Sequence, residues 1–278
     1  MDIQPVAGAL GAEISGVDLR QEFSNSVAAE IHAAFLKHHV LFFRDQHLTP
    51  QQELRFTRIF GEPDLYPFLQ GLPDAPEVIE ILKTETDTKN FGGSWHSDTT
   101  YMEKPALGSV LSAVEVPDYG GDTLFANTAM AYDALSDGMK ALLAGLVGVN
   151  SSEGPYRGGR KAAMATLNGM KDAYAVEAEV YESEHPVIRT HPETGGKAIY
   201  VNSSHTKRFR GMTEAESRPL IDFLCRHVIR PEFTCRFRWT PGALAVWDNR
   251  CTQHHALNDY AGRRRRMHRV TIKGDRPF

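Results

Sequence analysis

The chain has 278 residues, of which 41% are hydrophobic and 24% are charged, and its formal net charge is −4 at pH 7. This composition is ordinary for a soluble globular protein and excludes an intrinsically disordered chain. The pI near 6.3 and the scattered basic residues provide no basic face for a nucleic-acid partner, and the length allows one large domain.

Two short strands and a helix are predicted at the start of the chain. Residues 6–19 hold small apolar runs separated by glycines, which is typical of two short strands joined by turns. From 27 to 36 the apolar residues recur at helical spacing behind Asn25 and Ser26, the candidate caps. This helix is expected to give way to a strand at 40–43.

A second helix has a strong start signal. Thr49 can cap it, Pro50 suits its first turn, and Gln52 can close a capping box. We expect this helix to run to Gly61.

The middle of the chain predicts strands, helices and a loop. Strands are expected at 78–82 and at 107–116, where apolar residues alternate with period two. A helical pattern runs from 128 to 146 with a break at Ser136. The stretch from 151 to about 180 opens with residues rich in Gly, Ala and charge and without periodicity, which is typical of a mobile loop or lid.

The last third of the chain is predicted to consist mostly of strands. Thr213 and Glu216 open a helix, and Pro219 inside it is expected to bend or delay it. Strands are expected at 187–190, 198–202, 233–239, 243–247 and 267–273. Many strands, few covering helices and the absence of a repeat or linker predict a single domain over residues 1–278. Its fold class is mostly β with covering helices, a double-stranded β-helix or jelly-roll barrel.

The cysteine content and the hydropathy of the chain indicate the cellular compartment in which the protein is expected. The three cysteines lack metal-ligand spacing, and an odd count suits a reducing compartment. They are Cys225, Cys235 and Cys251. The N-terminus has neither a basic start nor an apolar core, and no window approaches 18 apolar residues. We therefore expect a cytoplasmic protein without a membrane span.

Three residues are candidates for one metal site. His96 and Asp98 lie two apart and would point to the same face of an extended chain. The third ligand must come from elsewhere, and the histidines after the strand at 243–247 are the best source. Two imidazoles and one carboxylate leave three positions of an iron open, as non-haem Fe(II) oxygenases require. Because H-x-D pairs are common by chance, ordinary surface polarity is the alternative reading.

Two arginines near the C-terminus are candidate anion-binding residues. Arg265 opens a predicted strand eleven residues after His254 and shares one face of it with Arg269. The two guanidiniums would be ~13 Å apart at ~3.3 Å per residue, far enough to hold two different anions beside a metal. A solvated basic run is the better reading for their neighbours, Arg263, Arg264 and Arg266.

Four motifs together resemble one family. The sequence contains, in order, W-H-S-D-T-T-Y, P-x-x-G-G-D-T, W-D-N-R-x-T-Q-H and R-x-M-H-R. These resemble the taurine dioxygenase family, which includes phenoxyalkanoate dioxygenases and alkylsulfatases. The likeness runs from Gly11 to Asp275, and four ordered motifs make an accidental match improbable.

The resemblance implies a cofactor, a co-substrate and their ligands. The implied iron ligands are His96, Asp98 and His254. Thr123 and Arg265 match the residues that hold the distal carboxylate of 2-oxoglutarate, and an arginine with a hydroxyl is a strong carboxylate clamp. The cofactor set is then Fe(II), 2-oxoglutarate and O2. Strand-like alternation would point the neighbouring histidine, His255, away from the metal.

The implied substrate pocket departs from that of a taurine enzyme. Tyr66 stands where a histidine is found, Gly92 where an asparagine is found, and His205 where an aromatic residue is usual. Arg269 matches the residue that binds the substrate's anionic group. The remaining pocket residues are Thr99 and Tyr101. The two tyrosines favour a substrate with a larger or more apolar body than taurine.

The implied reaction couples oxidative decarboxylation of 2-oxoglutarate to succinate with hydroxylation of a substrate C–H bond. The expected substrate is a small organic anion, namely a sulfonate, an alkyl sulfate, or an aryloxy or other carboxylate. A hydroxylated carbon that carries such a heteroatom would collapse and release it. We also expect a homo-oligomer, as a dimer or tetramer. Two alternatives stay open, a zinc hydrolase and a non-catalytic metabolite-binding barrel.

Overall fold

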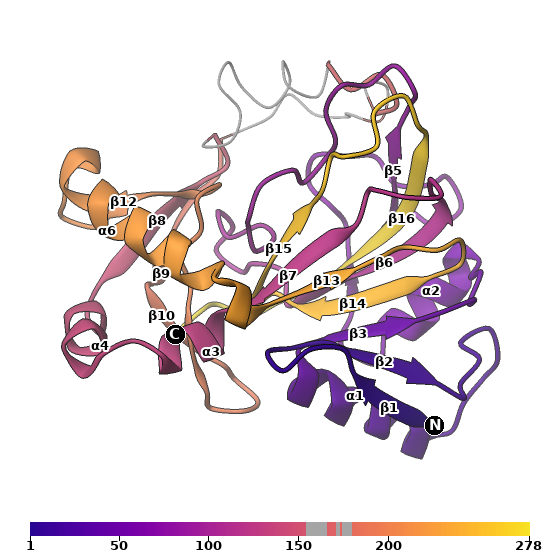
Figure 1. Cartoon of the computed structure of the whole chain (residues 1–278), viewed down its shortest axis with the longest axis horizontal. Helices are drawn as coiled ribbons and strands as arrows, with labels where there is room; N and C mark the ends of the chain where they lie inside the picture. The colour runs from indigo at the N-terminus through magenta and orange to yellow at the C-terminus, as the bar shows by residue number, and fades with distance from the viewer. Residues whose placement is uncertain (154–165, 171–172, 174–179) are drawn as a thin grey trace.

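The computed structural model describes residues 1–153, 166–170, 173 and 180–278, and over these ranges the chain is mostly β with few helices (Figure 1). The strands are β1 Asp2–Pro5, β2 Ala12–Ser15, β3 Val40–Phe43, β4 Pro63–Asp64, β5 Val78–Lys83, β6 Gly108–Glu115, β7 Thr123–Asn127, β8 Val147–Ser151, β9 Glu182–Pro186, β10 Ile188–Thr190, β11 Lys197–Ile199, β12 Thr206–Phe209, β13 Thr234–Phe237, β14 Leu244–Asp248, β15 Thr252–Ala256 and β16 Arg265–Ile272. The helices are α1 Asn25–His38, α2 Pro50–Thr57, α3 Thr128–Asp133, α4 Asp137–Leu143 and α6 Glu214–Val228, with a 3-10 turn at Pro231–Phe233.

A large sheet forms the base of the molecule. Within the described residues its strand order is β1-β2-β3-β14-β6-β16-β4. β5 pairs with β16 on the edge opposite β6, next to β4. All these pairs are antiparallel except β2 with β3. One face of the sheet packs against α1 and α2, whose buried Phe35 and Phe56 join Phe43 and Val246 in one apolar core. Figure 1 shows both helices on the outer side of this sheet.

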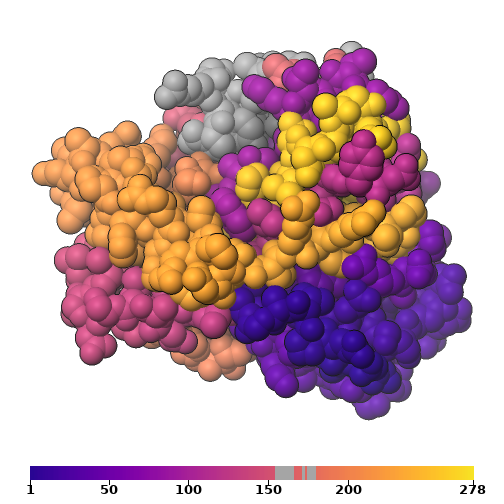
Figure 2. All heavy atoms as spheres, viewed as in Figure 1, coloured from indigo at the N-terminus to yellow at the C-terminus, as the bar shows by residue number. Residues whose placement is uncertain are grey.

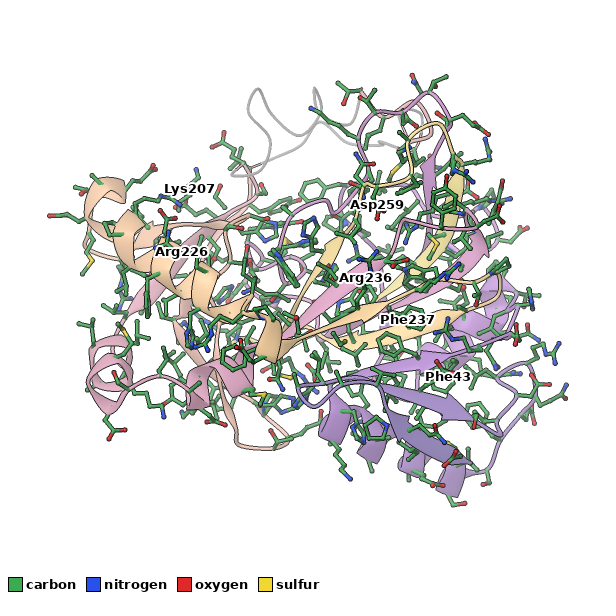
Figure 3. The ribbon with its side chains drawn as sticks, in the orientation of Figure 1. Phe43, Lys207, Arg226, Arg236, Phe237 and Asp259 are labelled. Carbon is green, nitrogen blue, oxygen red and sulfur yellow. The ribbon has the colours of Figure 1, made fainter. Side chains whose placement is uncertain are left out.

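A smaller sheet of order β13-β7-β15 packs against the other face. Phe42 of β3 stacks on Phe237 of β13, with ring centroids 4.1 Å apart. The next residue, Phe43, points into the helix-covered core, and Figure 3 labels both Phe43 and Phe237. β3 and β14 are buried on both faces, so their sequences are almost continuously apolar. This pattern is why both strands could be predicted.

A third group of elements lies beside the sandwich. Helices α3, α4 and α6 pack with β8 to β12 around a separate apolar core that contains Val187, Phe209 and Leu224. Figure 2 shows this group, from magenta to orange, filling one side of the molecule next to the indigo N-terminal elements. In the described ranges, no helix combines the length and the apolar character that crossing a membrane requires.

Three predicted helix starts are confirmed, but the first helix is capped by Ser24, which accepts the Val27 N–H, and not by Asn25 or Ser26. Thr49 caps α2 in a capping box with Gln52, Thr213 does the same for α6 with Glu216, and Ser136 caps α4 at the predicted break. The expectation that the second helix reaches Gly61 is wrong, because α2 ends at Thr57 and tighter i→i+3 turns follow. Inside α6, a proline at 219 does not end the helix.

The predicted pair of strands within 6–19 is half wrong. The second strand is β2, but the first lies earlier, at Asp2–Pro5. Residues 6–11 form the connecting turn, in which the Val6 N–H donates to the Gly11 carbonyl and Gly11 has φ +89°. The mostly polar β1 has no apolar alternation and therefore gave no signal. The loop or lid predicted at about 151–180 falls largely outside the described residues.

Candidate active site

His96, Asp98 and His254 converge at one end of the sandwich. His96 and His254 are joined by two backbone hydrogen bonds of 3.1 and 2.8 Å, in an isolated antiparallel bridge. Asp98 Oδ1 lies 3.6 Å from His96 Nε2 and 3.7 Å from His254 Nε2. The three donor atoms are all within 4.8 Å of one another, which suits one metal ion.

The protonation states of these side chains also suit a metal. His96 Nδ1 donates to the Ser94 carbonyl at 2.7 Å, which leaves the Nε2 lone pair directed toward Asp98. Burial lowers the pKa of His254 well below its ordinary value, so its imidazole is neutral. Burial would raise the pKa of Asp98, but the neighbouring Arg269 guanidinium outweighs it and, with the Asn249 hydrogen bond, holds the pKa of that carboxyl below its usual range.

Asp98 is held by two side chains that the sequence analysis did not single out. Its Oδ2 accepts from Ser109 Oγ and from Asn249 Nδ2, both at 3.0 Å. The Asn249 oxygen in turn accepts from the Asp98 backbone N–H at 3.2 Å and from Trp247 Nε1 at 3.0 Å. Asn249 belongs to the W-D-N-R motif, so its buried amide directly after a strand was a signal that could have been used.

The extended chain expected from His96 to Asp98 ends before Asp98. His96 is extended only at its bridge, and a turn begins at Asp98. Thr99 has φ +50°, a left-handed conformation that β-branched residues rarely adopt. Its hydroxyl accepts the Ala106 N–H at 2.9 Å and helps hold this turn. Such strain at a candidate site is typical of a functional constraint.

Arg269 lies beside the metal-site carboxylate. Its Nη2 is 3.0 Å from Asp98 Oδ1, and its guanidinium sits 5.3 Å from the centre of the Tyr66 ring. The predicted shared face of β16 is confirmed, because Arg265 and Arg269 are both buried on the side opposite Arg266. Arg266 instead pairs with Glu80.

Arg265 is buried without a carboxylate partner among the described residues. Its Nε and Nη2 have no hydrogen-bond partner, and its guanidinium lies 5.8 Å from the centre of the Trp239 ring. The Trp239 indole donates to Thr123 Oγ1 at 3.0 Å, so the Thr123 hydroxyl proton remains available to an acceptor. The sequence-predicted pair therefore meets around Trp239.

A cavity of about 460 Å³ opens onto the metal-site residues His96 and Asp98. The predicted substrate residues that line it are Tyr66, Thr99, Tyr101, His205 and Arg269, and Gly92 lines it as well. Arg265 lines a separate small cavity next to it. An apolar cluster that includes Phe68, Leu167 and Met170 backs the two tyrosines. The site thus combines a polar metal end with an aromatic wall.

His205 is fixed by a polar pair behind it. Asn202 Nδ2 donates to Thr100 Oγ1 at 3.2 Å, and the same oxygen lies 2.9 Å from His205 Nδ1, within hydrogen-bond distance. The ring lies 4.9 Å from that of Tyr101 and 5.9 Å from that of His96.

A second cluster of metal-ligand types does not suit a metal. His191, Asp248 and Cys251 also bring their donor atoms together. However, Arg250 pairs with Asp248 at 2.7 Å, and His191 Nε2 lies 3.0 Å from the same Asp248 oxygen. The carboxylate is therefore already neutralised, and the cluster ties the end of β14 to the loop after β10.

Known proteins are similar to this chain over nearly its full length. The family model of "Taurine catabolism dioxygenase TauD, TfdA family" matches residues 2–271. The alpha-ketoglutarate-dependent sulfate ester dioxygenase of Pseudomonas putida is 37% identical, over 100% of this chain and 91% of its own length. The alkylsulfatase of Acinetobacter baylyi is 36% identical, over 99% of this chain and 86% of its own length.

Two solved structures extend the comparison to the fold. A taurine dioxygenase from Burkholderia xenovorans has a TM-score of 0.82 and 37% identity, covering 99% of this chain and 90% of its own. The structure of AAD-2 in complex with Mn(II) and N-oxalylglycine has a TM-score of 0.82 and 28% identity, covering 100% and 99%. With the family model matching residues 2–271, this chain belongs to the TauD, TfdA family.

Proposed function

We propose that His96, Asp98 and His254 hold Fe(II) in this chain, and that the enzyme oxidises a small organic anion in the adjoining cavity. The class of reaction follows from the family: the chain is a 2-oxoglutarate-dependent dioxygenase. The observation that carries the residue assignment is the convergence of two imidazoles and one ionised carboxylate within 4.8 Å. The overall reaction converts 2-oxoglutarate, O2 and R–H into succinate, CO2 and R–OH.

Each metal-site residue has a defined task in this proposal. Iron held by these three side chains would supply the oxidation of the substrate by O2. His96 offers Nε2, since its other nitrogen is committed to the Ser94 carbonyl. Asp98 offers Oδ1, since Ser109 and Asn249 occupy Oδ2. These contacts fix the orientation of the ligands before any ion arrives.

The co-substrate is assigned to Arg265 and Thr123. A buried guanidinium without a carboxylate partner among the described residues is costly unless an anion binds to it. Thr123 adds a hydroxyl donor at the same place, because the Trp239 indole donates to its oxygen and leaves the hydroxyl proton for an acceptor. The distal carboxylate of 2-oxoglutarate would pair with the Arg265 guanidinium and accept the Thr123 hydroxyl proton at the same time.

The substrate is assigned to the cavity beside Asp98. Arg269 supplies the positive charge for an anionic group, and the His205 imidazole adds a polar ring on another wall. Tyr66 and Tyr101 supply flat apolar surface with polar tips. The relatives act on sulfate esters and phenoxypropionate by name, and an anion with an apolar body fits the same lining here.

We also infer the finer fold and assembly. The face-to-face packing of the large sheet and the β13-β7-β15 sheet supports a double-stranded β-helix, the jelly-roll barrel expected from the sequence. The homo-oligomer stays a prediction.

Two alternatives are separated from this proposal by one experiment. Purified protein is loaded anaerobically with Fe(II) or Zn(II) and given 2-oxoglutarate with sulfonates, alkyl sulfates and aryloxy acids, and succinate and O2 are followed. Substrate-dependent succinate formation that needs Fe(II) and O2 is the expected result. Product release with Zn(II) and without O2 would instead assign a hydrolase. Tight anion binding with neither metal nor O2 consumption would assign a metabolite-binding barrel.

A further inference from the structure

Lys83 is a second buried cation next to Arg265. It ends β5, and its Cα partner in the sheet is Arg265 of β16, so the two side chains leave the same face. Lys83 is 5% exposed and Arg265 is 6% exposed. The Lys83 ammonium has no hydrogen-bond partner, and two of the Arg265 nitrogens have none. Neither side chain has an ion pair within the described part of the chain.

Both cations face one small cavity without an acidic wall. The cavity is lined by the buried Lys83 and Arg265 together with Tyr260 and the less buried Lys89, and no carboxylate residue among the described residues lines it. The nearby Asp122 is already bound to Arg236, at 2.6 Å, and Asp259 also turns toward Arg236, as Figure 3 shows. Asp122 also acts on the charge of Arg265, but it forms no ion pair with Arg265 or Lys83, so the positive charge of this cavity is compensated only in part.

The Tyr260 ring compensates only part of this charge. The Lys83 Nζ lies 4.5 Å from the ring centre, close enough for a cation–π contact. Such a contact offsets a fraction of the cost of burying an ammonium, which is largely met only by an anion or by hydrogen bonds. A structure that buries two neighbouring cations in this way is organised for an anionic ligand.

The size of the cavity limits what that ligand is. Its volume is about 10 Å³, room for one water-sized group. A free phosphate or sulfate is too large for it. One oxygen of a carboxylate fits, provided that the rest of the molecule lies on the other side of Arg265, toward Thr123 and the metal site.

We propose that Lys83 is a second cationic residue for the distal carboxylate of 2-oxoglutarate, acting together with Arg265. This inference rests on the proposed function, which assigns Arg265 and Thr123 to that carboxylate. The two cations make the site selective for a 2-oxo acid with a second carboxylate at the far end. Lys83 thereby sets the choice of co-substrate without touching the metal.

The test compares two ligands that differ only at the distal end. Binding of 2-oxoglutarate and of 2-oxopentanoate, which has a methyl group in place of the distal carboxylate, is measured by calorimetry on Fe(II)-loaded protein without O2. Lys83→Met should weaken 2-oxoglutarate binding by roughly 10- to 100-fold and leave 2-oxopentanoate binding unchanged. Lys104→Met removes the same charge from an exposed position and should change neither affinity.

The second measurement is the Tm of the metal-free protein, which reports the stability of the folded state. Because Lys83→Met replaces an unpaired buried ammonium with an apolar chain of similar shape, it should raise the Tm of the metal-free protein. Glutarate, a dicarboxylate added here as a ligand, should raise the Tm of this variant by less than it raises the Tm of the wild type. Lys83→Arg keeps a cation there and should retain most of the preference for 2-oxoglutarate.

The outcomes separate this inference from the assignment of Arg265. If Lys83→Met binds 2-oxoglutarate like the wild type, or loses both ligands equally, Lys83 only packs against Tyr260 and the proposal is overturned. Arg265→Met should also abolish the preference for the dicarboxylic acid. If Arg265→Met keeps that preference, the proposed clamp itself is wrong, whatever Lys83 does.

Discussion

Asn249 and Asp98 are joined by two hydrogen bonds of opposite direction. The Asn249 amide donates to Asp98 Oδ2 at 3.0 Å, and its oxygen accepts the Asp98 backbone N–H at 3.2 Å. This pairing fixes both the position of the carboxylate and the rotation of its plane. It leaves Oδ1 turned toward the two imidazoles.

Asn249→Asp should weaken metal binding while keeping the fold. The new carboxylate can still accept from the backbone N–H and from Trp247, but it can no longer donate to Asp98, and the two negative charges repel. We expect metal affinity to fall by about 10- to 100-fold. Anaerobic Fe(II) titration by calorimetry measures this. Ser109→Ala, which removes one of the two donors to Oδ2, should cost less.

His254→Ala and His255→Ala should behave differently. His254 is buried with Nε2 directed at Asp98, whereas His255 is half-buried and packs edge-on against Trp95 at 5.6 Å. The first variant should lose Fe(II) binding and turnover, and the second should keep both. Metal content and succinate formation decide the matter, and the reverse pattern would move the ligand by one residue.

Arg265→Ala should raise the 2-oxoglutarate requirement strongly. Loss of one charge-assisted clamp costs ~2 to 3 kcal/mol, or roughly 30- to 150-fold in affinity. Thr123→Val keeps the shape and removes only a hydroxyl, so about a tenfold loss is expected. Equilibrium binding of 2-oxoglutarate ranks the two variants. An unchanged requirement in Arg265→Ala would return that arginine to the basic run.

Arg269→Ala should discriminate against charged substrates. Arg269 lines the cavity and also lies 3.0 Å from Asp98 Oδ1, so it has two separable roles. If it binds the substrate anion, kcat/KM for an anionic substrate should fall about 30- to 150-fold relative to a neutral analogue of the same shape. If it only supports Asp98, both substrates should suffer equally. Normal 2-oxoglutarate binding is the control.

Glu53 predicts a pH dependence of stability. Burial raises the pKa of its carboxyl from 4.5 to about 8, so the folded protein keeps it protonated where the unfolded chain ionises it. The resulting stabilisation is complete below pH 4.5 and is lost as the pH rises to about 8. Glu53→Gln should flatten this slope and be more stable than the wild type at pH 9, by on the order of 2 to 4 kcal/mol.

Urea unfolding at pH 5, 7 and 9 measures that slope. Glu30→Gln, on the exposed side of α1, is the matched control and should reproduce the wild-type slope. Identical slopes in the wild type and in Glu53→Gln would mean that another group carries the pH dependence.

The fold was predictable wherever burial leaves a clear pattern. β3 and β14 are apolar on both faces, and α2 and α6 begin at capping boxes, so local residues determine them. β15 reads Thr-Gln-His-His-Ala and has no such pattern. It is a strand because β7 pairs along its whole length, and a pairing between distant segments leaves no local signal.

The site was predictable as a set of residues but not as a geometry. The ligand types and their order pointed to His96 and His254, yet the left-handed Thr99 could not be foreseen, because β-branched residues rarely adopt that conformation. Lys83 ends a correctly predicted strand. Which face of that strand is buried depends on its partner β16, so the inward direction of its ammonium emerges only from the fold.

The backbone bridge between His96 and His254 has a consequence for how the protein survives without its ion. Small zinc domains assemble their ligands only when the metal arrives, so chelators unfold them. Here two of the three proposed ligand residues are already tied together by main-chain hydrogen bonds of 3.1 and 2.8 Å. The entropy of gathering the ligands is therefore spent during folding, and a chelator should yield an intact, inactive protein that recovers as soon as metal is returned.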